Sequence, residues 1–449
     1  MEAKVAGPKS RVGRRPSEEG AAPVAARRPS VSGDVSGGQG RRAKGQPPGP
    51  APGPGHAQGH AQGHAQANTL AHPHAHANVP RTVSLFGHLP HFDRWAALGA
   101  HGAASVTSQL LRGSREPALH PAIIRLGLAY ADYAVLGAQE RCRQMLLAFQ
   151  AVFRDYQAPP DQAISRHLEA HLRPLIAFLV QARPLGVAMG HAIRHLKLKI
   201  ATLPPDTTEA EARAFMCAVV DSYVRNRIDL ADELIAQHGC SKIRDGDVLL
   251  AFAHSAVVLR LLLRAHRTGR RFRVVVVDSR PFLEGRRMLR ALVRAGIDCT
   301  YLHLAALGHV MKEVTTVLLG AHALYSNGAL LSRAGTAAVA LLAHAAGKPV
   351  IVCCESLKFS DGLLLDSIVY NELGDPDALL PPPGHPARIH LAAWRAAPSP
   401  LRLLNILYDV TPPEMISLVI SEVGLIPVTS IPVVLREYNS NANASVASH

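Results

Sequence analysis

The stretch Val274–Gly285, VVVVDSRPFLEG, decides the fold class of this 449-residue chain. Four consecutive valines are typical of a strand buried on both faces, and the Asp-Ser-Arg-Pro that follows is typical of a loop. Further short apolar runs are Val248–Phe252, Thr316–Leu319 and Val350–Cys353, and helical spacing is found at Glu284–Arg294 and Ser332–Ala346. Strand-sized runs that alternate with helices predict a parallel sheet, and therefore an α/β domain at residues 241–439.

Residues 118–240 have the apolar period of helices. Two stripes at helical spacing are Met145, Phe149, Val152 and Phe153, and Leu168, Leu172, Leu175 and Leu179. Thr208–Glu211 is typical of a capping box at a helix start, and Gly239 is a candidate for the end of that helix. This segment is predicted to be an all-helical domain.

The last part of the chain carries another pattern of a helix start. In Thr411–Glu414, a threonine cap is followed by prolines and a glutamate at the third helical position. We expect the helix to reach Glu422. Ile431–Leu435 then predicts a final buried strand, and the polar residues 440–449 predict a frayed tail.

Residues 1–80 are a basic tail of low complexity, with ten basic and four acidic residues and three GHAQ repeats. Such a composition cannot bury enough apolar surface to offset the entropy of ordering, so the tail is predicted to be disordered and residues 81–117 to be a linker. Its six histidines, at positions 56, 60, 64, 72, 74 and 76, have no acidic or cysteine neighbours that would complete a metal site.

Composition excludes several classes of protein. The chain has 48 basic and 34 acidic residues, a formal net charge of +14, which is not that of an acidic solvating protein. It has no apolar run of about 18 residues, as a membrane span requires, and no apolar core of a secretory signal. None of the six cysteines forms a C-x-x-C pair, so neither a zinc site nor a disulfide framework is predicted, and a reducing cytosol is expected.

Residues that directly follow the predicted strands are candidates for a site, because an open α/β sheet binds ligands beyond the carboxyl ends of its strands. They are Ala253, His254, Ser255, Asp278, Ser279, Arg280, Pro281, Gly320, Ala321, His322, Asn327, Gly328, and Ser332 and Arg333 on to Thr336. The sequence has no G-x-G-x-x-G and no Walker A motif, so no nucleotide-binding motif supports a nucleotide site.

Each chemical interpretation of these residues has a structural alternative. A helix start at Ser332–Thr336, with Arg333, would suit a phosphate, or Ser332 is only a cap. His254 and His322 are general bases, or structural histidines, since neither has a visible carboxylate partner.

Several blocks of the chain resemble the alpha, beta and delta regulatory subunits of eukaryotic translation initiation factor 2B. The blocks are VVVVDSRPFLEG from Val274, LLGAHALYSNGALLSRAGTAAVALLA from Leu318 and PVIVCCESLKF from Pro349, with SLFGHLP from Ser84, HPAIIRLGLAY from His120 and PLGVAMGHAIRHLK from Pro184. NELGDPDAL from Asn371 and LRLLNILYDVTPPEMISLVISEVGLIPVTSIPVVLRE from Leu401 resemble the delta branch of that family. The resemblance covers roughly residues 80–437.

That family is similar to sugar-phosphate aldose–ketose isomerases, which implies a Rossmann-like parallel sheet. The resemblance places Ala253 where those enzymes have a catalytic cysteine and His322 where they have a catalytic aspartate. Asn327-Gly328-Ala329 replaces their Asn-Gly-Asp, and Ser332-Arg333 replaces Asn-Lys. Alanine cannot transfer a proton, so the resemblance implies a degenerate pocket, with Asp278 beside it, where Arg280 and Arg333 are the side chains left to hold a phosphate.

The resemblance implies a non-catalytic regulatory subunit of the guanine-nucleotide exchange factor for initiation factor 2. The implied partners are the alpha, beta, gamma and epsilon subunits of that complex, with delta–beta pairing through the α/β domains, and initiation factor 2, including its phosphorylated alpha subunit. Arg183, Arg194 and Arg225 of the helical domain are expected to contact that factor, or else to belong to a solvated helix face. No cofactor, membrane or nucleic acid is expected, and the expected location is the cytosol.

Two other classes of function remain as alternatives. One is an active aldose–ketose sugar-phosphate isomerase. The other is an RNA-binding protein that uses the basic tail of residues 1–80, for which steep salt dependence of binding is expected.

Overall fold

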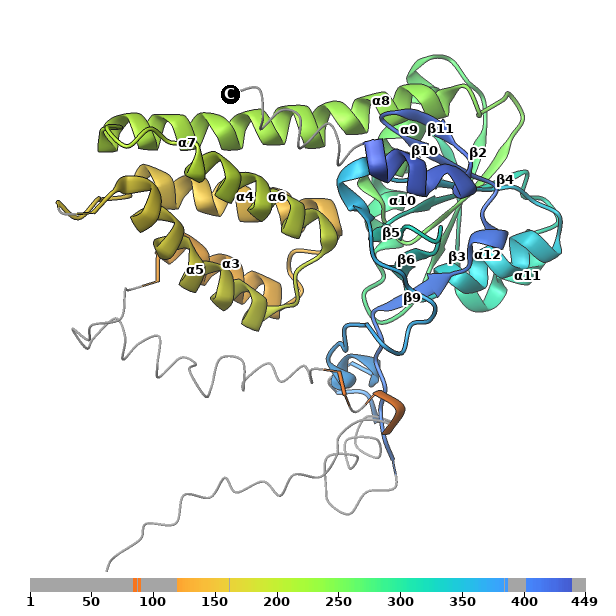
Figure 1. The fold of residues 1–449 in the computed structure, drawn as a ribbon. Helices are drawn as coiled ribbons and strands as arrows, with labels where there is room; N and C mark the ends of the chain where they lie inside the picture. Colours follow the sequence, from red (N-terminus) through yellow and green to blue (C-terminus); the bar gives the residue numbers. More distant parts are fainter. Residues whose placement is uncertain are drawn as a thin grey trace, which may run out of the picture. The chain divides into compact units, whose positions relative to one another are not determined.

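The computed structural model shows a helical part followed by an α/β part (Figure 1). It describes residues 84–86, 88–89, 119–160, 162–382, 384–386 and 401–437. The predictions for residues 1–80 and 440–449 lie outside these residues, as does most of the predicted linker. The boundary between residues 240 and 241 stays a prediction, since contacts join the described residues on both sides of it in one unit.

The helical part is a bundle around one apolar core. Its elements are α3 (Pro121–Ala131), α4 (Ala138–Arg154), α5 (Ile164–Ala182), α6 (Val187–Ala201), α7 (Glu209–Tyr223), the π-helix η2 (Val224–Asp229) and α8 (Leu230–Cys240). The predicted stripes are buried in this core, as the helical period requires.

The capping box at the start of α7 is confirmed. The Glu211 amide donates to the Thr208 hydroxyl over 3.3 Å, and the Thr208 amide donates to the Glu211 carboxylate over 2.9 Å. The continuous helix α7–η2–α8 then ends at Cys240, so Gly239 lies in its last turn. A Cβ at Gly239 would lie 2.6 Å from Leu261, and this glycine therefore permits close packing of α8 on α9 (Ala256–Arg267).

A seven-stranded sheet forms the centre of the α/β part, in the order β11-β10-β7-β4-β1-β2-β3. Its strands are β1 (Val248–Phe252), β2 (Arg273–Asp278), β3 (Asp298–His303), β4 (Thr316–Gly320), β7 (Val350–Cys353), β10 (Leu418–Ser421) and β11 (Gly424–Ile426). All neighbouring strands are parallel except β10 and β11. The four predicted strands and the predicted α/β fold class are confirmed.

Helices cover both faces of this sheet and enclose two apolar cores. The helix α8 packs on one face with α9 and with α10 (Gly285–Arg294). The other face is covered by α11 (Leu307–Val310), by α12 (Thr336–Ala345) and by the helical residues 431–437. Because both faces are buried, the central strands are apolar at every position.

A second sheet has the strand order β8-β5-β6-β9, and all of its strands follow β4 in the sequence. It consists of β5 (Ala323–Tyr325), β6 (Leu330–Arg333), β8 (Phe359–Ser360) and β9 (Tyr408–Thr411). The prediction that a helix starts at Ser332 is wrong, because Ser332 and Arg333 pair with β9 and the helix begins only at Thr336, after Gly335 in the left-handed conformation.

Two predictions for the last part of the chain are also wrong. Residues 411–422 do not form a helix, because Leu418–Ser421 is a strand inserted between β7 and β11. Residues 431–437 are helical, so the predicted strand at 431–435 does not form. Short helical turns are η1 (Ser84–Phe86), η3 (Leu304–Ala306), η4 (Ser356–Lys358), η5 (Pro376–Leu379), η7 (Pro413–Met415) and η8 (Val428–Ser430).

The described residues contain neither a candidate membrane span nor a candidate metal cluster. Among their helices, none is both long and apolar enough to cross a membrane. No group of three or more His, Cys, Asp or Glu side chains in those ranges is arranged to hold a metal ion.

Candidate functional site

The candidate pocket lies at the carboxyl ends of β1 and β4, and its cavity volume is about 110 Å³. Nine of the candidate residues line it together: Ala253, His254, Ser255, Gly320, Ala321, His322, Ser332, Arg333 and Thr336. The first turn of α4 and the side chains of Glu284, Arg287, Lys358 and Tyr408 complete its walls. A smaller neighbouring cavity has Asp278 and Arg280 in its lining, and shares Ala253 and Arg333 with the first.

Ala253 has a positive φ of 53°, in the left-handed backbone region that residues other than glycine rarely adopt. Its amide donates to the Val277 carbonyl over 2.8 Å, which holds it at the end of β1. The unusual backbone conformation thus positions a methyl group, which cannot accept or donate a proton.

Both pocket histidines fit the structural interpretation better than that of a general base. Burial lowers the pKa of His322 well below its ordinary value, and the nearby Arg141 guanidinium lowers it further. Burial and then Arg287 also lower the pKa of His254. Since such histidines remain neutral and bind protons weakly, they are poor bases. The His322 ring instead packs on the Tyr408 ring, with 4.3 Å between centroids.

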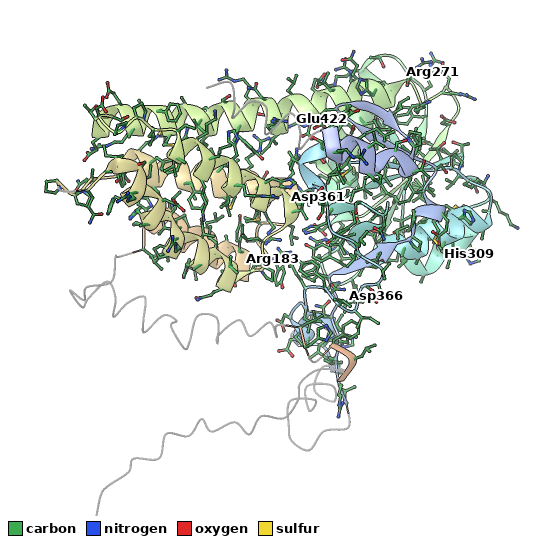
Figure 2. All side chains as sticks on the ribbon, in the orientation of Figure 1. Arg183, Arg271, His309, Asp361, Asp366 and Glu422 are labelled. Atoms are coloured by element: carbon green, nitrogen blue, oxygen red, sulfur yellow. The ribbon has the colours of Figure 1, made fainter. Side chains whose placement is uncertain are left out.

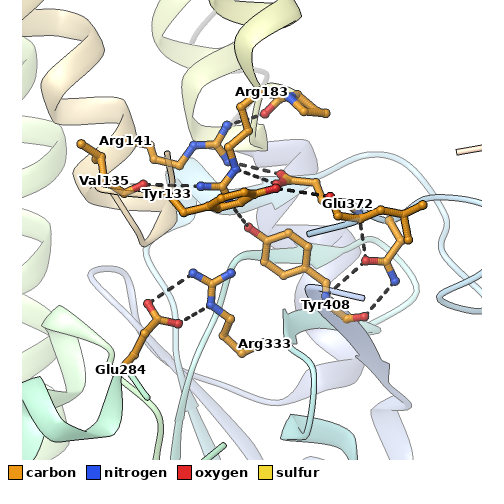
Figure 3. Close-up of polar contacts among 11 residues, drawn as sticks. Tyr133, Val135, Arg141, Arg183, Glu284, Arg333, Glu372 and Tyr408 are labelled. Carbon is orange, nitrogen blue, oxygen red and sulfur yellow. Dashed lines mark hydrogen bonds and ion pairs between the residues drawn. The ribbon is translucent and has the colours of Figure 1, made fainter. Parts of the chain in front are cut away.

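Behind His322, two buried arginines share one carboxylate (Figure 3). The Arg141 Nη1 lies 3.3 Å from Glu372 Oε1, and the Arg183 Nε donates to Glu372 Oε2 over 2.7 Å. Arg183 also donates to the Tyr408 hydroxyl over 3.1 Å, and its guanidinium lies 4.5 Å from the Tyr133 ring centroid. This cluster joins α4, the end of α5, and β9 around Glu372.

Arg333, the residue predicted to hold a phosphate, already has an anionic partner. Its Nε and Nη2 donate to the two oxygens of Glu284, over 2.5 Å and 3.2 Å (Figure 3). This two-point geometry is the one with which arginine binds carboxylate or phosphate. The chain's own glutamate therefore occupies the Nε edge of this guanidinium, while Nη1 is buried without a hydrogen-bond partner among the described residues.

A second buried charge cluster adjoins the pocket at Lys358. The Lys358 ammonium lies 2.6 Å from a Glu355 oxygen, and both side chains are buried. Nearby on α8, Asp232 is fully buried and accepts a hydrogen bond of 2.7 Å from Gln139. Burial, together with the Glu355 charge, raises the pKa of Asp232 to about 7.

The structure does not bring all the predicted pocket residues together. The Asn327 amide donates to the Leu364 carbonyl over 2.9 Å, and Gly328 packs closely against Val428. Neither lines the pocket. Asp278 is buried and accepts a hydrogen bond of 2.9 Å from the Tyr301 hydroxyl, so its contacts within the chain are structural.

One of the three arginines expected to contact a partner is in the wrong place for that role. Arg183 is only 2% exposed and is bound to Glu372 at the junction between the helical and α/β parts (Figure 2). The prediction is corrected because a buried, paired guanidinium cannot reach another protein. Arg194 on α6 and Arg225 on η2 are exposed.

The sequence analysis did not identify the residues that form buried ion pairs beside the pocket. Glu372 lies in the NELGDPDAL block, yet nothing in that block shows that its carboxylate meets Arg141 and Arg183, which are 231 and 189 residues away. Lys358 and Glu355 follow the Val350–Cys353 strand, and their position after a strand end was the available signal.

Family comparison settles the kinship of the chain. The model of the initiation factor 2 subunit family matches residues 134–428, which includes most of the helical part and nearly all of the α/β part. The chain belongs to this family. The resemblance deduced from the blocks around Val274 and Leu318 is confirmed.

The delta branch predicted from the C-terminal blocks is confirmed by similarity to curated relatives. The chain is 46% identical over 328 residues to translation initiation factor eIF2B subunit delta of Schizosaccharomyces pombe, covering 71% of this chain and 69% of the relative. It is 42% identical to the subunit of the same name from Dictyostelium discoideum, covering 80% of this chain and 57% of that protein.

A solved structure agrees with this kinship. The chain is similar to a chain in the crystal structure of the tetrameric eIF2B-beta2-delta2 complex from C. thermophilum, with a TM-score of 0.62 and 30% identity. The match covers 76% of this chain and 98% of that chain.

The relation to isomerases is present but more distant. Ribose 1,5-bisphosphate isomerase of Pyrococcus furiosus is 30% identical over 287 residues, covering 63% of this chain and 84% of that enzyme. The family kinship thus includes an enzyme, while the higher identities are to delta subunits.

Proposed function

We propose that this chain is a delta-type, non-catalytic regulatory subunit of translation initiation factor 2B, which promotes exchange of GDP for GTP on initiation factor 2. Kinship with the delta subunits supports the assignment. The pocket supports the non-catalytic role, because Ala253 and a neutral His322 stand where the isomerase resemblance expects the catalytic pair. A cytosolic location follows from this role in translation.

The observation that best supports a role in assembly is an exposed apolar segment, residues 363–369, that the fold holds in place. Leu363, Leu365 and Val369 are 71%, 87% and 71% exposed. The segment is tied at both ends, because Asn327 donates to the Leu364 carbonyl and Asn371 donates to the carbonyls of Ser367 and Tyr408. Apolar side chains fixed in water on a folded protein indicate a surface for another protein.

We assign this surface to a sister subunit, with delta–beta pairing as the expected contact. Fully burying a leucine or valine side chain contributes about 1.5–3 kcal/mol, so these three side chains can supply several kcal/mol of binding free energy. The alpha, gamma and epsilon subunits are the further partners that this role implies.

Co-purification with the beta subunit tests the pairing. We expect the double variant Leu365→Glu/Val369→Glu to weaken pairing at least tenfold, because two buried charges would face an apolar partner surface. Leu341→Glu, at a position 51% exposed on α12, is the matched control and should pair normally. A stable wild-type monomer in the presence of beta, measured by native mass, would refute the proposal.

The helical part is the proposed surface for initiation factor 2 and its phosphorylated alpha subunit. Arg194 and Arg225 are exposed there, and the rings of His195 and Tyr223, 5.0 Å apart, bring the two arginine-bearing segments together. In this mechanism an unphosphorylated factor engages a productive face, whereas a phosphorylated factor binds an alternate face and biases the assembly against exchange. Such a bias requires different affinities for two states of the assembly.

The two alternative functions, sugar-phosphate isomerase and RNA-binding protein, have weaker support than the role as a regulatory subunit. The isomerase kinship is real, but Glu284 binds Arg333, and Ala253 and a neutral His322 stand where the resemblance expects the catalytic pair. A coupled assay of the purified chain with ribose 1,5-bisphosphate tests the isomerase alternative directly. Turnover of this substrate would show that the chain is an active isomerase. The proposed RNA-binding tail lies outside the described residues and stays a prediction.

A further inference from the structure

Helix α10 carries a stripe of arginines that faces solvent. Arg287, Arg290 and Arg294 are three and four residues apart, so they lie on one side of the helix, and all three are exposed. Arg287, at the start of the stripe, also lines the candidate pocket. Met288 and Leu292 on the opposite side are buried against the sheet. We call these three arginines and the neighbouring Val293 the α10 stripe.

The surroundings of α10 extend the positive charge. Arg267 at the end of α9, and Arg270 and Arg271 in the turn after it, are exposed, and α9 packs beside α10. Figure 2 shows Arg271 at the outer edge of the α/β part. The nearest acidic residues along the chain are Glu284, which binds Arg333, and Asp298, which is exposed at the start of β3.

The α10 stripe differs from paired surface arginines such as Arg213 in having no acidic partner, and from unpaired ones such as Arg194 in gathering three arginines on one helix face. Arg213 pairs with Glu209, Arg264 with Glu233, and Arg273 with Glu313. In the described part of the chain, no carboxylate forms an ion pair with Arg287, Arg290 or Arg294. A solvated helix face normally mixes both signs of charge, because like charges at helical spacing repel each other.

The chemistry of the stripe fits an acidic protein better than a nucleic acid. Val293, between Arg290 and Arg294, is 57% exposed and offers an apolar contact that a phosphate backbone does not need. Neither α9 nor α10 contains Phe, Tyr or Trp, the side chains on which unpaired bases stack. Every cation of the stripe is arginine, whose planar guanidinium binds carboxylates through two hydrogen bonds.

We propose that the α10 stripe docks a glutamate- and aspartate-rich protein segment that also places an aliphatic side chain on Val293. Arg287, Arg290 and Arg294 bind the carboxylates, and Val293 sets the register of the segment along the helix. This surface belongs to a different element from the apolar segment at Leu363–Val369, so its function does not depend on delta–beta pairing.

Fluorescence anisotropy with the full chain, in complex with its beta partner where the two associate, tests the proposal. The probes are a polyglutamate peptide, the same peptide with leucines at helical spacing, and a polyuridine oligonucleotide. We expect the leucine-containing acidic peptide to bind most tightly, with an affinity that falls as salt rises. Arg290→Glu/Arg294→Glu should weaken its binding at least tenfold, and Val293→Ser should remove the advantage of leucine over polyglutamate.

Arg166→Glu/Arg173→Glu is the matched control, since it makes the same change in charge at two exposed positions of α5. We expect it to leave peptide binding unchanged, while circular dichroism shows all variants folded. Equal weakening by the control would reduce the effect to net charge and overturn the proposal. Tighter binding of polyuridine than of the acidic peptides would assign the stripe to nucleic acid and overturn it as well, as would the absence of peptide binding at low salt.

Discussion

The buried arginines behind the pocket and the exposed arginines of α10 are the same residue type in opposite settings. Arg141, Arg183 and Arg333 are surrounded by protein, and each lies against a carboxylate of the chain. Arg290 and Arg294 are surrounded by solvent and have no acidic partner in the described part of the chain. Their difference separates arginines that hold the fold together from arginines available to another molecule.

The physical reason is the cost of removing a charge from water. A buried guanidinium without a counter-charge is expensive, so the fold must supply one. An exposed guanidinium remains hydrated, so the fold need not supply one. Pairing in the interior therefore follows from folding alone, whereas the clustering of three like charges on one face of α10 is not required by the fold.

The largest effect is expected from removing the carboxylate that two buried arginines share. Glu372→Gln should lower the free energy of unfolding by about 3–5 kcal/mol, the usual cost of breaking a buried ion pair from one side. Chemical denaturation at neutral pH measures this.

Glu169→Gln, at an exposed position of α5, is the matched control and should change stability by less than about 0.5 kcal/mol. If both variants had the same small effect, Glu372 would not be the charge that holds this junction together.

A smaller, pH-dependent effect is expected at Asp232. Its pKa is about 7 in the folded chain, above the ordinary aspartate value of 3.8, so folding favours the protonated form. Stability from this group is complete below about pH 4, and roughly 4 kcal/mol of it is lost as the pH rises through 7. Asp232→Asn should remove this pH dependence while keeping an acceptor for Gln139.

Unfolding curves of wild type and variant between pH 5 and 8 make the measurement. Asp206→Asn, at an exposed position, should leave the wild-type pH profile unchanged. A pH profile that is identical in wild type and Asp232→Asn would show that this carboxyl titrates normally in the folded chain.

The smallest effect compares two helix-surface arginines directly. Arg290→Gln should leave stability unchanged or raise it by about 0.2–0.5 kcal/mol, because it relieves repulsion from Arg294 and Arg286 at i,i+4 spacing. Arg213→Gln should lower stability by a similar amount, because it removes the ion pair with Glu209. Thermal unfolding of the two variants under the same buffer conditions measures this difference. A lower stability of Arg290→Gln than of wild type would mean that the stripe has a structural role.

The sequence predicts those strands whose burial is continuous along the chain. Val274–Val277 and Val350–Cys353 are apolar at every position because they are central in the sheet. The edge strand Asp298–His303 alternates in exposure and has no apolar run to mark it. Leu418–Ser421 was mistaken for part of a helix because the Thr411–Glu414 cap signal is local, whereas its pairing with β7 joins residues far apart.

The location of the pocket can be predicted from the sequence, whereas the carboxylates that bind its arginine and the arginines near it cannot. Ala253 and His322 follow strand ends, and strand ends of a parallel sheet meet at one edge. The Glu284 carboxylate reaches the pocket from a loop, and the Glu372 carboxylate reaches Arg141 and Arg183 from a distant segment; no spacing in the sequence encodes these contacts. Arg183 was misplaced because a sequence does not distinguish an arginine that has a buried partner from one that does not.

The late position of β9 and β10 in the chain has a consequence for synthesis. Tyr408–Thr411 completes the small sheet beside β6, and Leu418–Ser421 completes the large sheet beside β7. While the ribosome is still making these residues, the emerged strands β6 and β7 each have an edge with unpaired backbone groups, the kind of edge that invites aggregation. The helical part, whose contacts are mostly local, can fold earlier, so the nascent chain depends on its final segment to protect both sheets at once.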